Sequence, residues 1–303
     1  MTTATAPAKR SAATPDLSRA ALPLRRRAID LTARLLMVLA VLAAGVPLLL
    51  VIYHVLAKGV GIVDLDFLTA DIPVRARVAG PGMGPAVVGT LIITGAAALL
   101  SIPLGVLGAV YLNEYGKQSL LARVIRTMAD VMTGVPSVVM GLFILVVWVL
   151  AVGEQTGFAA ALALACLMLP VIIRSSEEML RLVPDELRQA SAALGARRWR
   201  TTVSVVLPAA ISGITSGAML AIARAAGETA PIVVVAGTVT WTNWNLFEGN
   251  NTTLTAQIFK NAVEPFEAAH GRAWGAALTL MMIVLVFTIL ARFIAGRFAI
   301  KNR

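Results

Sequence analysis

The chain alternates between long apolar stretches and shorter polar segments. A helix needs about 20 predominantly apolar residues to cross the hydrocarbon core of a bilayer. Six stretches approach or exceed that length, at residues 35–57, 87–112, 127–150, 157–174, 209–236 and 274–295. Each is continuously apolar instead of alternating every second residue, which favours helices over membrane-barrel strands. The pattern therefore predicts an all-α polytopic membrane protein with about six transmembrane helices, of which 157–174 is the shortest.

Composition agrees with this pattern, because 58% of the 303 residues are hydrophobic and only 14% are charged. Soluble domains carry about 25% charged residues. The net charge of +10 could indicate a nucleic-acid partner, but the positions of the basic residues argue against one. Lys and Arg number 20 in four segments (before residue 35, 113–126, 174–207 and after 291) and 5 in the loops 58–86 and 237–272. By the positive-inside rule, both termini and the loop 174–207 are cytoplasmic.

The domain organisation expected from the sequence is simple. Residues 1–34 form a largely disordered basic tail, since their composition buries too little apolar surface to fold alone. Residues 35–296 form a single transmembrane domain, and 297–303 form a short cytoplasmic tail. The single cysteine allows no internal disulfide, and the two histidines are far apart, so we expect neither a metal site nor a cofactor in this chain.

Two ionisable residues interrupt the apolar stretch Ala209–Ala236. Arg224 lies near its middle, roughly 20 Å from either membrane surface at the rise of an α-helix, and Glu228 follows four residues later. An Arg at the centre of a membrane helix costs roughly 2.5–3.5 kcal/mol on insertion scales, so such residues usually face a polar pathway or a bundle interior. We therefore expect function in Ala223–Pro231.

The chemistry of these side chains suits an anion pathway. Arg224 offers a planar fork that holds two oxygens of an oxyanion, and Glu228 at i+4 weakens a hold that would otherwise trap the anion. We predict a substrate pathway at Arg224, Glu228 and Thr229, with a helix kink at Gly227 and Pro231. The alternative is an ion pair that only locks the packing of two subunits.

Other polar and small residues within the spans have simpler interpretations. Ser101–Gly105 and Gly134–Ser137 permit bends or close helix approach, and we expect packing there before binding. Asp130 follows Arg126 by four residues, which predicts an i,i+4 ion pair.

The cytoplasmic loop 174–207 is expected to contain a short amphipathic helix. Pro184 suits a first helical position, Asp185 and Glu186 suit the first turn, and Gly195 suits the helix end. One apolar stripe lies between them, formed by Leu187, Ala190, Ala193 and Leu194. Such a helix either lies on lipid or docks a cytoplasmic partner.

This loop resembles the signature of the permeases of ATP-binding-cassette importers, which reads Glu-Ala-Ala, three residues, Gly, and then an aliphatic-x-Leu-Pro ending. Its counterparts here are Gln189-Ala190-Ser191, Gly195 and Val205-Val206-Leu207-Pro208. Gln189 and Ser191 depart from the signature, and Asp185 and Glu186, one turn earlier, could supply the missing carboxylate. The resemblance implies a type I importer permease whose loop couples to a separate ATPase.

A narrower resemblance, to the PstA-type permeases of phosphate-specific importers, rests on three motifs: Gly84–Thr90, Thr133–Leu142 and Ala223–Pro231. It implies that Arg224 serves phosphate passage across the bacterial cytoplasmic membrane. It also implies three partners: a paralogous permease forming a heterodimer, an ATP-binding subunit dimer that uses ATP and magnesium, and an extracytoplasmic phosphate-binding protein. The chain has no Gly-x-x-x-x-Gly-Lys-Ser/Thr phosphate loop, so we expect a transport subunit that is not an ATPase.

Three alternatives remain open from the residues alone. An Arg would serve a permease for another oxyanion, such as phosphonate, sulfate or molybdate, equally well. A proton-coupled secondary transporter with Glu228 titrating would work without an ATPase partner. An intramembrane enzyme is disfavoured, because the chain has no Gly-x-Ser-x-Gly elbow.

Overall fold

The computed structural model describes residues 24–80 and 82–298, and every regular element in that part of the chain is helical. Five of the described helices are long and apolar enough to cross a membrane, and a bent pair of helices makes up a sixth span. This agrees with the predicted number of spans. The chain divides into two compact units, residues 1–53 and 54–303.

The first unit contains most of helix α1 (Leu24–Gly59). The prediction of a disordered tail over 1–34 is wrong for residues 24–34, which are helical, and residues 1–23 lie outside the described part of the chain. The reason is local, since Leu, Arg and Ala dominate this segment and all three are strong helix formers. The boundary between the two compact units falls after Tyr53, within α1.

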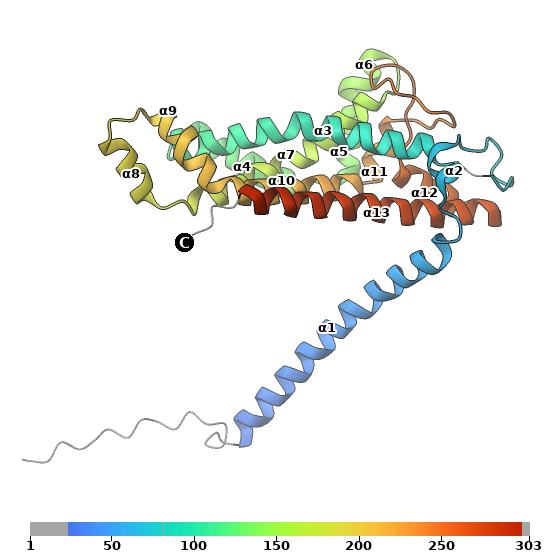
Figure 1. The fold of residues 1–303 in the computed structure, drawn as a ribbon, viewed down its shortest axis with the longest axis horizontal. Coiled ribbons are helices and arrows are strands. Elements are labelled where there is room, and N and C mark those ends of the chain that lie inside the picture. Colours follow the sequence, from blue (N-terminus) through green and yellow to red (C-terminus); the bar gives the residue numbers. More distant parts are fainter. Residues whose placement is uncertain (1–23, 81, 299–303) are drawn as a thin grey trace, which may run out of the picture. The chain divides into compact units, whose positions relative to one another are not determined.

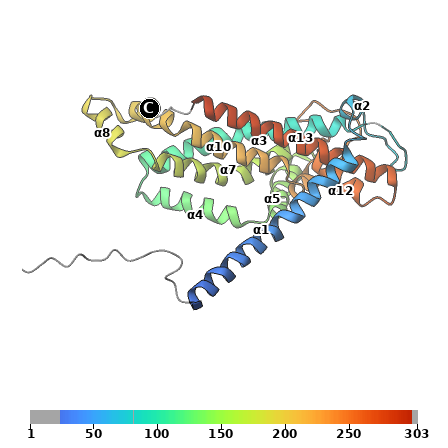
Figure 2. The same cartoon turned by 60° about the horizontal axis from the view of Figure 1, so that its bottom comes forward.

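Four long helices of the second unit pack side by side: α3 (Gly84–Val110), α7 (Gly157–Arg181), α10 (Leu207–Ala226) and α13 (Glu267–Phe298) (Figures 1 and 2). Small residues let them approach closely. A Cβ added at Gly105 would lie 2.6 Å from the Ile172 side chain, and one at Gly217 would lie 2.4 Å from the Ser175 hydroxyl. The predicted packing role of Gly105 is therefore confirmed.

Short elements cover the two ends of these helices (Figures 1 and 2). At one end lie α8 (Asp185–Ala193), α9 (Arg198–Thr201) and the π-helical turn η4 (Thr202–Val206). At the other end lie α2 (Leu65–Thr69) and α12 (Leu254–Ala262). Two loops pair there, because the Ile72 N–H donates to the Thr240 carbonyl at 2.8 Å.

The third predicted span is not one straight helix. It consists of α4 (Leu120–Gly134), α5 (Ser137–Ile144), the π-helical turn η3 (Leu145–Val149) and α6 (Leu150–Val152), with a bend of 108° between α4 and the rest. Pro136 has no N–H to donate and forces Val135 into an extended conformation, with ψ of 129°. The bend that Gly134–Ser137 permits is thus realised.

The fifth predicted span, 209–236, is also interrupted. Helix α10 ends at Ala226, and α11 (Ala230–Val235) begins only after the non-helical residues 227–229. A proline in the first turn of a helix costs no hydrogen bond, so Pro231 suits the start of α11 better than the interior of a continuous helix. The predicted kink is therefore a complete break.

Candidate functional site

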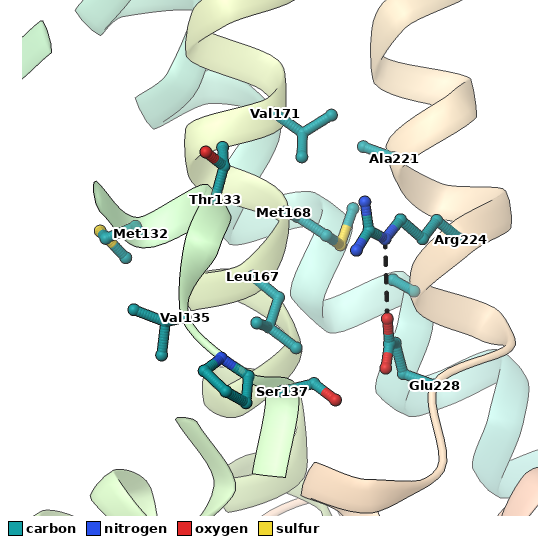
Figure 3. Close-up of a pocket in the computed structure, with 12 residues that line it drawn as sticks. Met132, Thr133, Val135, Ser137, Leu167, Met168, Val171, Ala221, Arg224 and Glu228 are labelled. Atoms are coloured by element: carbon teal, nitrogen blue, oxygen red, sulfur yellow. Dashed lines mark ion pairs between the residues drawn. The ribbon is translucent and has the colours of Figure 1, made fainter. Parts of the chain in front are cut away.

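A pocket of about 220 Å³ lies where these two breaks meet (Figure 3). It is bounded by α4, the start of α5, α7 and the end of α10. The lining residues are Met132, Thr133, Val135, Pro136, Ser137, Leu167, Met168, Val171, Ala221, Arg224, Ala225 and Glu228. Two of the three predicted pathway residues, Arg224 and Glu228, thus share one wall.

Arg224 occupies the last turn of α10 and not the middle of a long span. Its side chain extends from α10 towards Met168 on α7 (Figure 3) and is 71% exposed in the isolated chain. Its Nε atom lies 3.6 Å from the Glu228 Oε1 atom, longer than a hydrogen bond. Across the described residues, Arg224 has no hydrogen bond to any other group, so its donors are available.

Other arginines in the protein are saturated by comparison. Arg126 donates to the Glu177 carboxylate at 2.7 Å and to two backbone carbonyls. Arg272 is buried and donates to the carbonyls of Val78 and Ala76 at 2.7 and 2.6 Å. Arg126 and Arg272 therefore stabilise the fold through hydrogen bonds to other segments, whereas Arg224 makes no such bond among the described residues.

Glu228 stands in the break between α10 and α11, and its backbone is fixed from both sides. Its N–H donates to the Ala225 carbonyl at 3.1 Å, and its own carbonyl accepts from the Thr255 hydroxyl at 3.0 Å. The Glu228 side chain is 21% exposed. A fixed backbone keeps this carboxylate beside Arg224.

The opposite wall carries two hydroxyl groups that the sequence did not mark as part of the site. The Thr133 hydroxyl donates to the Asp130 carbonyl at 2.6 Å. Ser137 begins α5, and its hydroxyl points towards Glu228 (Figure 3). We had expected packing at Gly134–Ser137. The sequence signal for this wall was Pro136, which exposes the start of α5 to the pocket.

The remaining predicted residues of this segment lie nearby with other roles. Thr229 is the N-cap residue of α11, is half-buried, and does not line the pocket. Gly227 has an ordinary helical φ of −90°, and a Cβ there would meet only the Arg224 carbonyl at 3.5 Å, so close approach does not require this glycine. Pro231 packs against Gly141 of α5.

The predicted Arg126–Asp130 pair is wrong. Arg126 pairs with Glu177 and Asp130 pairs with Arg174, both on α7, while Arg174 also lies 3.5 Å from Glu177. Both residues pair with the neighbouring helix instead of with each other, because α4 packs against α7. In addition, the buried Glu177 carboxylate needs positive charge around it.

The loop helix forms as α8, and its capping residues behave as predicted with one shift. Pro184 is the N-cap residue and not the first helical residue, so Asp185 and Glu186 form the first turn. Gly195 follows the helix with φ of +78°, a left-handed conformation that favours glycine.

The residues of the apolar stripe on α8 are all exposed. Gln189 and Ala190 are exposed as well, while the Ser191 hydroxyl bonds the Thr201 hydroxyl at 2.8 Å. Leu207 and Pro208 start α10. Among the described residues, no three His, Cys, Asp or Glu side chains group as metal ligands.

Comparisons with known proteins give a consistent result. Residues 101–300 match the family described as "Binding-protein-dependent transport system inner membrane component". The chain is 42% identical to the phosphate transport system permease protein PstA 1 of Mycobacterium tuberculosis over 283 residues, covering 91% of each protein. It is 37% identical to the PstA protein of Yersinia pestis, covering 82% of this chain and 84% of that one.

A solved structure is also similar. An inward facing conformation of the MetNI methionine ABC transporter matches 71% of this chain and 94% of its own chain, with a TM-score of 0.57 and 18% identity. At that identity the likeness concerns the fold alone.

Proposed function

The chain belongs to the PstA family of phosphate transport system permeases, within the binding-protein-dependent inner membrane components, and from that premise we propose that it lines an ATP-driven phosphate import pathway. The predicted all-α importer-permease fold is confirmed, and the chain is a multi-span transport subunit. Separate sets of residues bind the anion and dock the partner subunits.

The observation that carries the proposal is the set of free donors on Arg224. A guanidinium at a pocket wall whose only ion pair among the described residues is 3.6 Å long can turn its fork to two phosphate oxygens. Charge-assisted bonds of this kind are roughly twice as strong as neutral ones. Arg224 is therefore the phosphate ligand.

Glu228 acts as the counter-ion that limits the hold on phosphate. Its carboxylate is close enough to attract the guanidinium but too far to saturate it. When phosphate arrives, the two anions compete for one cation, and their repulsion favours release. The hydroxyl of Ser137 offers a neutral donor on the facing wall.

The opposing view is that Arg224 locks packing against a second permease. Its exposure in the isolated chain is compatible with that view, because a partner could cover it. The pocket favours the ligand role, since the guanidinium extends towards α7 of its own chain (Figure 3).

The partners follow from the family and from α8. We propose that the exposed stripe on α8, with Asp185, Glu186, Gln189, Ala190, Ser191 and Gly195, docks an ATP-binding subunit dimer that carries ATP and magnesium, and that Leu207 and Pro208 connect it to α10. A paralogous permease completes the pathway as a heterodimer, and an extracytoplasmic phosphate-binding protein delivers the substrate. Both termini then lie in the cytoplasm of a bacterium.

The proposal is tested with Arg224→Gln in the complete complex, reconstituted in liposomes. We expect normal assembly and at least about 100-fold slower phosphate uptake, because loss of two charged hydrogen bonds costs about 3 kcal/mol. The control is Arg292→Gln, an exposed arginine on α13 outside the pocket, which should transport as wild type.

Unchanged uptake in an assembled Arg224→Gln complex would contradict the ligand role, and loss of assembly would favour the packing role. Uptake of labelled phosphate in competition with phosphonate, sulfate or molybdate decides between oxyanions. If one of these oxyanions competes more strongly than unlabelled phosphate, that oxyanion and not phosphate is the preferred substrate.

A further inference from the structure

The end of α3 beside α8 is a junction where arginines from three other helices meet. There α3 continues into the π-helical turn η2 (Tyr111–Tyr115), whose Glu114 side chain is only 6% exposed. Arg188 of α8 donates to the Glu114 carboxylate through Nη2 at 2.9 Å and Nε at 3.3 Å. Arg198 of α9 donates to the Glu114 carbonyl, and Arg126 of α4 donates to the Leu112 carbonyl at 2.8 Å.

The geometry of η2 explains why arginines gather there. The Gly116 N–H donates to the Tyr111 carbonyl, five residues back, and the last carbonyls of a helix lack partners within it. Arginine donors supply those partners. The buried carboxylate of Glu114 additionally needs a cation, which Arg188 provides.

Arg188 connects three segments with one side chain. Besides Glu114, it donates to the Leu180 carbonyl at 3.0 Å at the end of α7 and to the Val183 carbonyl at 2.7 Å. It also pairs with Asp185 of its own helix at 3.0 Å. With 16% of the side chain exposed, it is a partly buried clasp between α8 and the ends of α3 and α7.

These contacts reach the pocket through α7. Leu180 lies nine residues beyond Val171, about 14 Å along the same helix. Val171, Met168 and Leu167 form the pocket wall that faces Arg224. The chain itself connects α8 to the other wall, through α9 and α10.

We propose that Glu114 and Arg188 are positioning residues that fasten the docking helix α8 to α3 and α7. A movement of α8 then shifts the α7 wall of the pocket together with the α10 wall. Without the clasp, the turn between α7 and α8 would absorb the movement, and only α10 would follow. This inference rests on the proposed function, because it assigns a task to the helix that docks the ATPase.

The test uses Glu114→Gln, Arg188→Gln and the double variant, each in the full chain in nanodiscs and in the reconstituted complex. In nanodiscs, amides of residues 185–193 should exchange hydrogen about tenfold faster in each variant, as expected for loss of a buried charged hydrogen bond. In the complex, ATP hydrolysis should continue while phosphate transported per ATP falls about tenfold. The double variant should match Arg188→Gln, since that single variant has already lost the ion pair with Glu114.

The matched control is Asp30→Asn, which removes an exposed carboxylate from its 2.7 Å pair with Arg34 on α1. It should leave exchange in α8 and transport per ATP unchanged. Wild-type exchange at 185–193 in Glu114→Gln, or a normal transport ratio in both single variants, would overturn the inference. A variant that fails to assemble is judged by exchange alone.

The same preparations separate this inference from the proposed function. If Arg224→Gln abolishes uptake while the Glu114 and Arg188 variants remain fully coupled, the proposed function stands and the clasp is refuted. If wild-type ATP hydrolysis does not respond to phosphate at all, both are refuted.

Discussion

Gly141 and Pro231 are in backbone contact, and this contact joins the helices that follow the two breaks. A Cβ added at Gly141 would lie 2.7 Å from the Pro231 Cα atom and 3.1 Å from its carbonyl oxygen. Gly141 belongs to α5 and Pro231 to α11, so the two half-helices are held at the closest distance that a glycine allows.

Gly141→Ala should therefore destabilise the protein. The methyl group has no room, because the two nearest atoms that it would meet belong to backbone, and overpacking of this kind costs about 1–3 kcal/mol. Thermal unfolding of the purified chain in detergent measures the loss. Gly95→Ala on α3 is the matched control, since nothing lies within 4 Å of its added Cβ, and it should unfold at or above the wild-type temperature. Equal midpoints for the two variants would contradict the predicted crowding.

Thr90→Val should also lower stability, for a different reason. The buried Thr90 hydroxyl accepts a 2.9 Å hydrogen bond from the Leu254 N–H at the start of α12. Valine keeps the shape but leaves that donor unsatisfied, at a cost of about 1–3 kcal/mol in the free energy of unfolding. Thr127→Val is the control, because its exposed hydroxyl bonds only a carbonyl of its own helix. A similar small change in both variants would show that the Leu254 bond contributes nothing.

The sequence predicted those elements whose signals are local. The runs of apolar residues set the number of spans, and Pro184 with Gly195 set the limits of α8 to within a residue or two. Arg224 and Glu228 were singled out because charges are costly within a membrane span, and the structure places both on one pocket wall.

What the sequence left undetermined depends on contacts between distant residues. A proline within a membrane helix can produce a mild kink when neighbours satisfy the freed backbone groups, or a complete break. The break after α10 is supported by the Thr255 hydroxyl, which takes the Glu228 carbonyl, and no local pattern reveals that bond. Likewise Asp130 prefers Arg174, 44 residues away, over the adjacent turn of its own helix.

Glu228→Gln should slow phosphate uptake by tightening the hold on the anion. The change removes the carboxylate that competes with phosphate for Arg224 and keeps the side chain's size. One lost charge repulsion of about 1.4 kcal/mol corresponds to about tenfold more labelled phosphate retained by the ATP-free complex, with uptake slowed to match. Glu154→Gln, an exposed carboxylate outside the pocket, should change neither quantity. Faster uptake, or unchanged retention in Glu228→Gln, would remove the counter-ion role.

Leu194→Glu should weaken binding of the ATPase subunit while leaving the permease fold intact. Leu194 is 89% exposed after α8, so the free chain loses no packing, and its thermal midpoint should match that of wild type. In a docked complex the side chain would be covered, and replacing a central apolar contact by a carboxylate costs about 2 kcal/mol or more, at least tenfold in affinity. Co-purification and titration with the ATPase subunit measure the effect. The control is Leu120→Glu, at a leucine that is 74% exposed at the start of α4, and this variant should bind the ATPase subunit as wild type does. Equal losses in both variants would mean that added negative charge, and not the α8 stripe, governs docking.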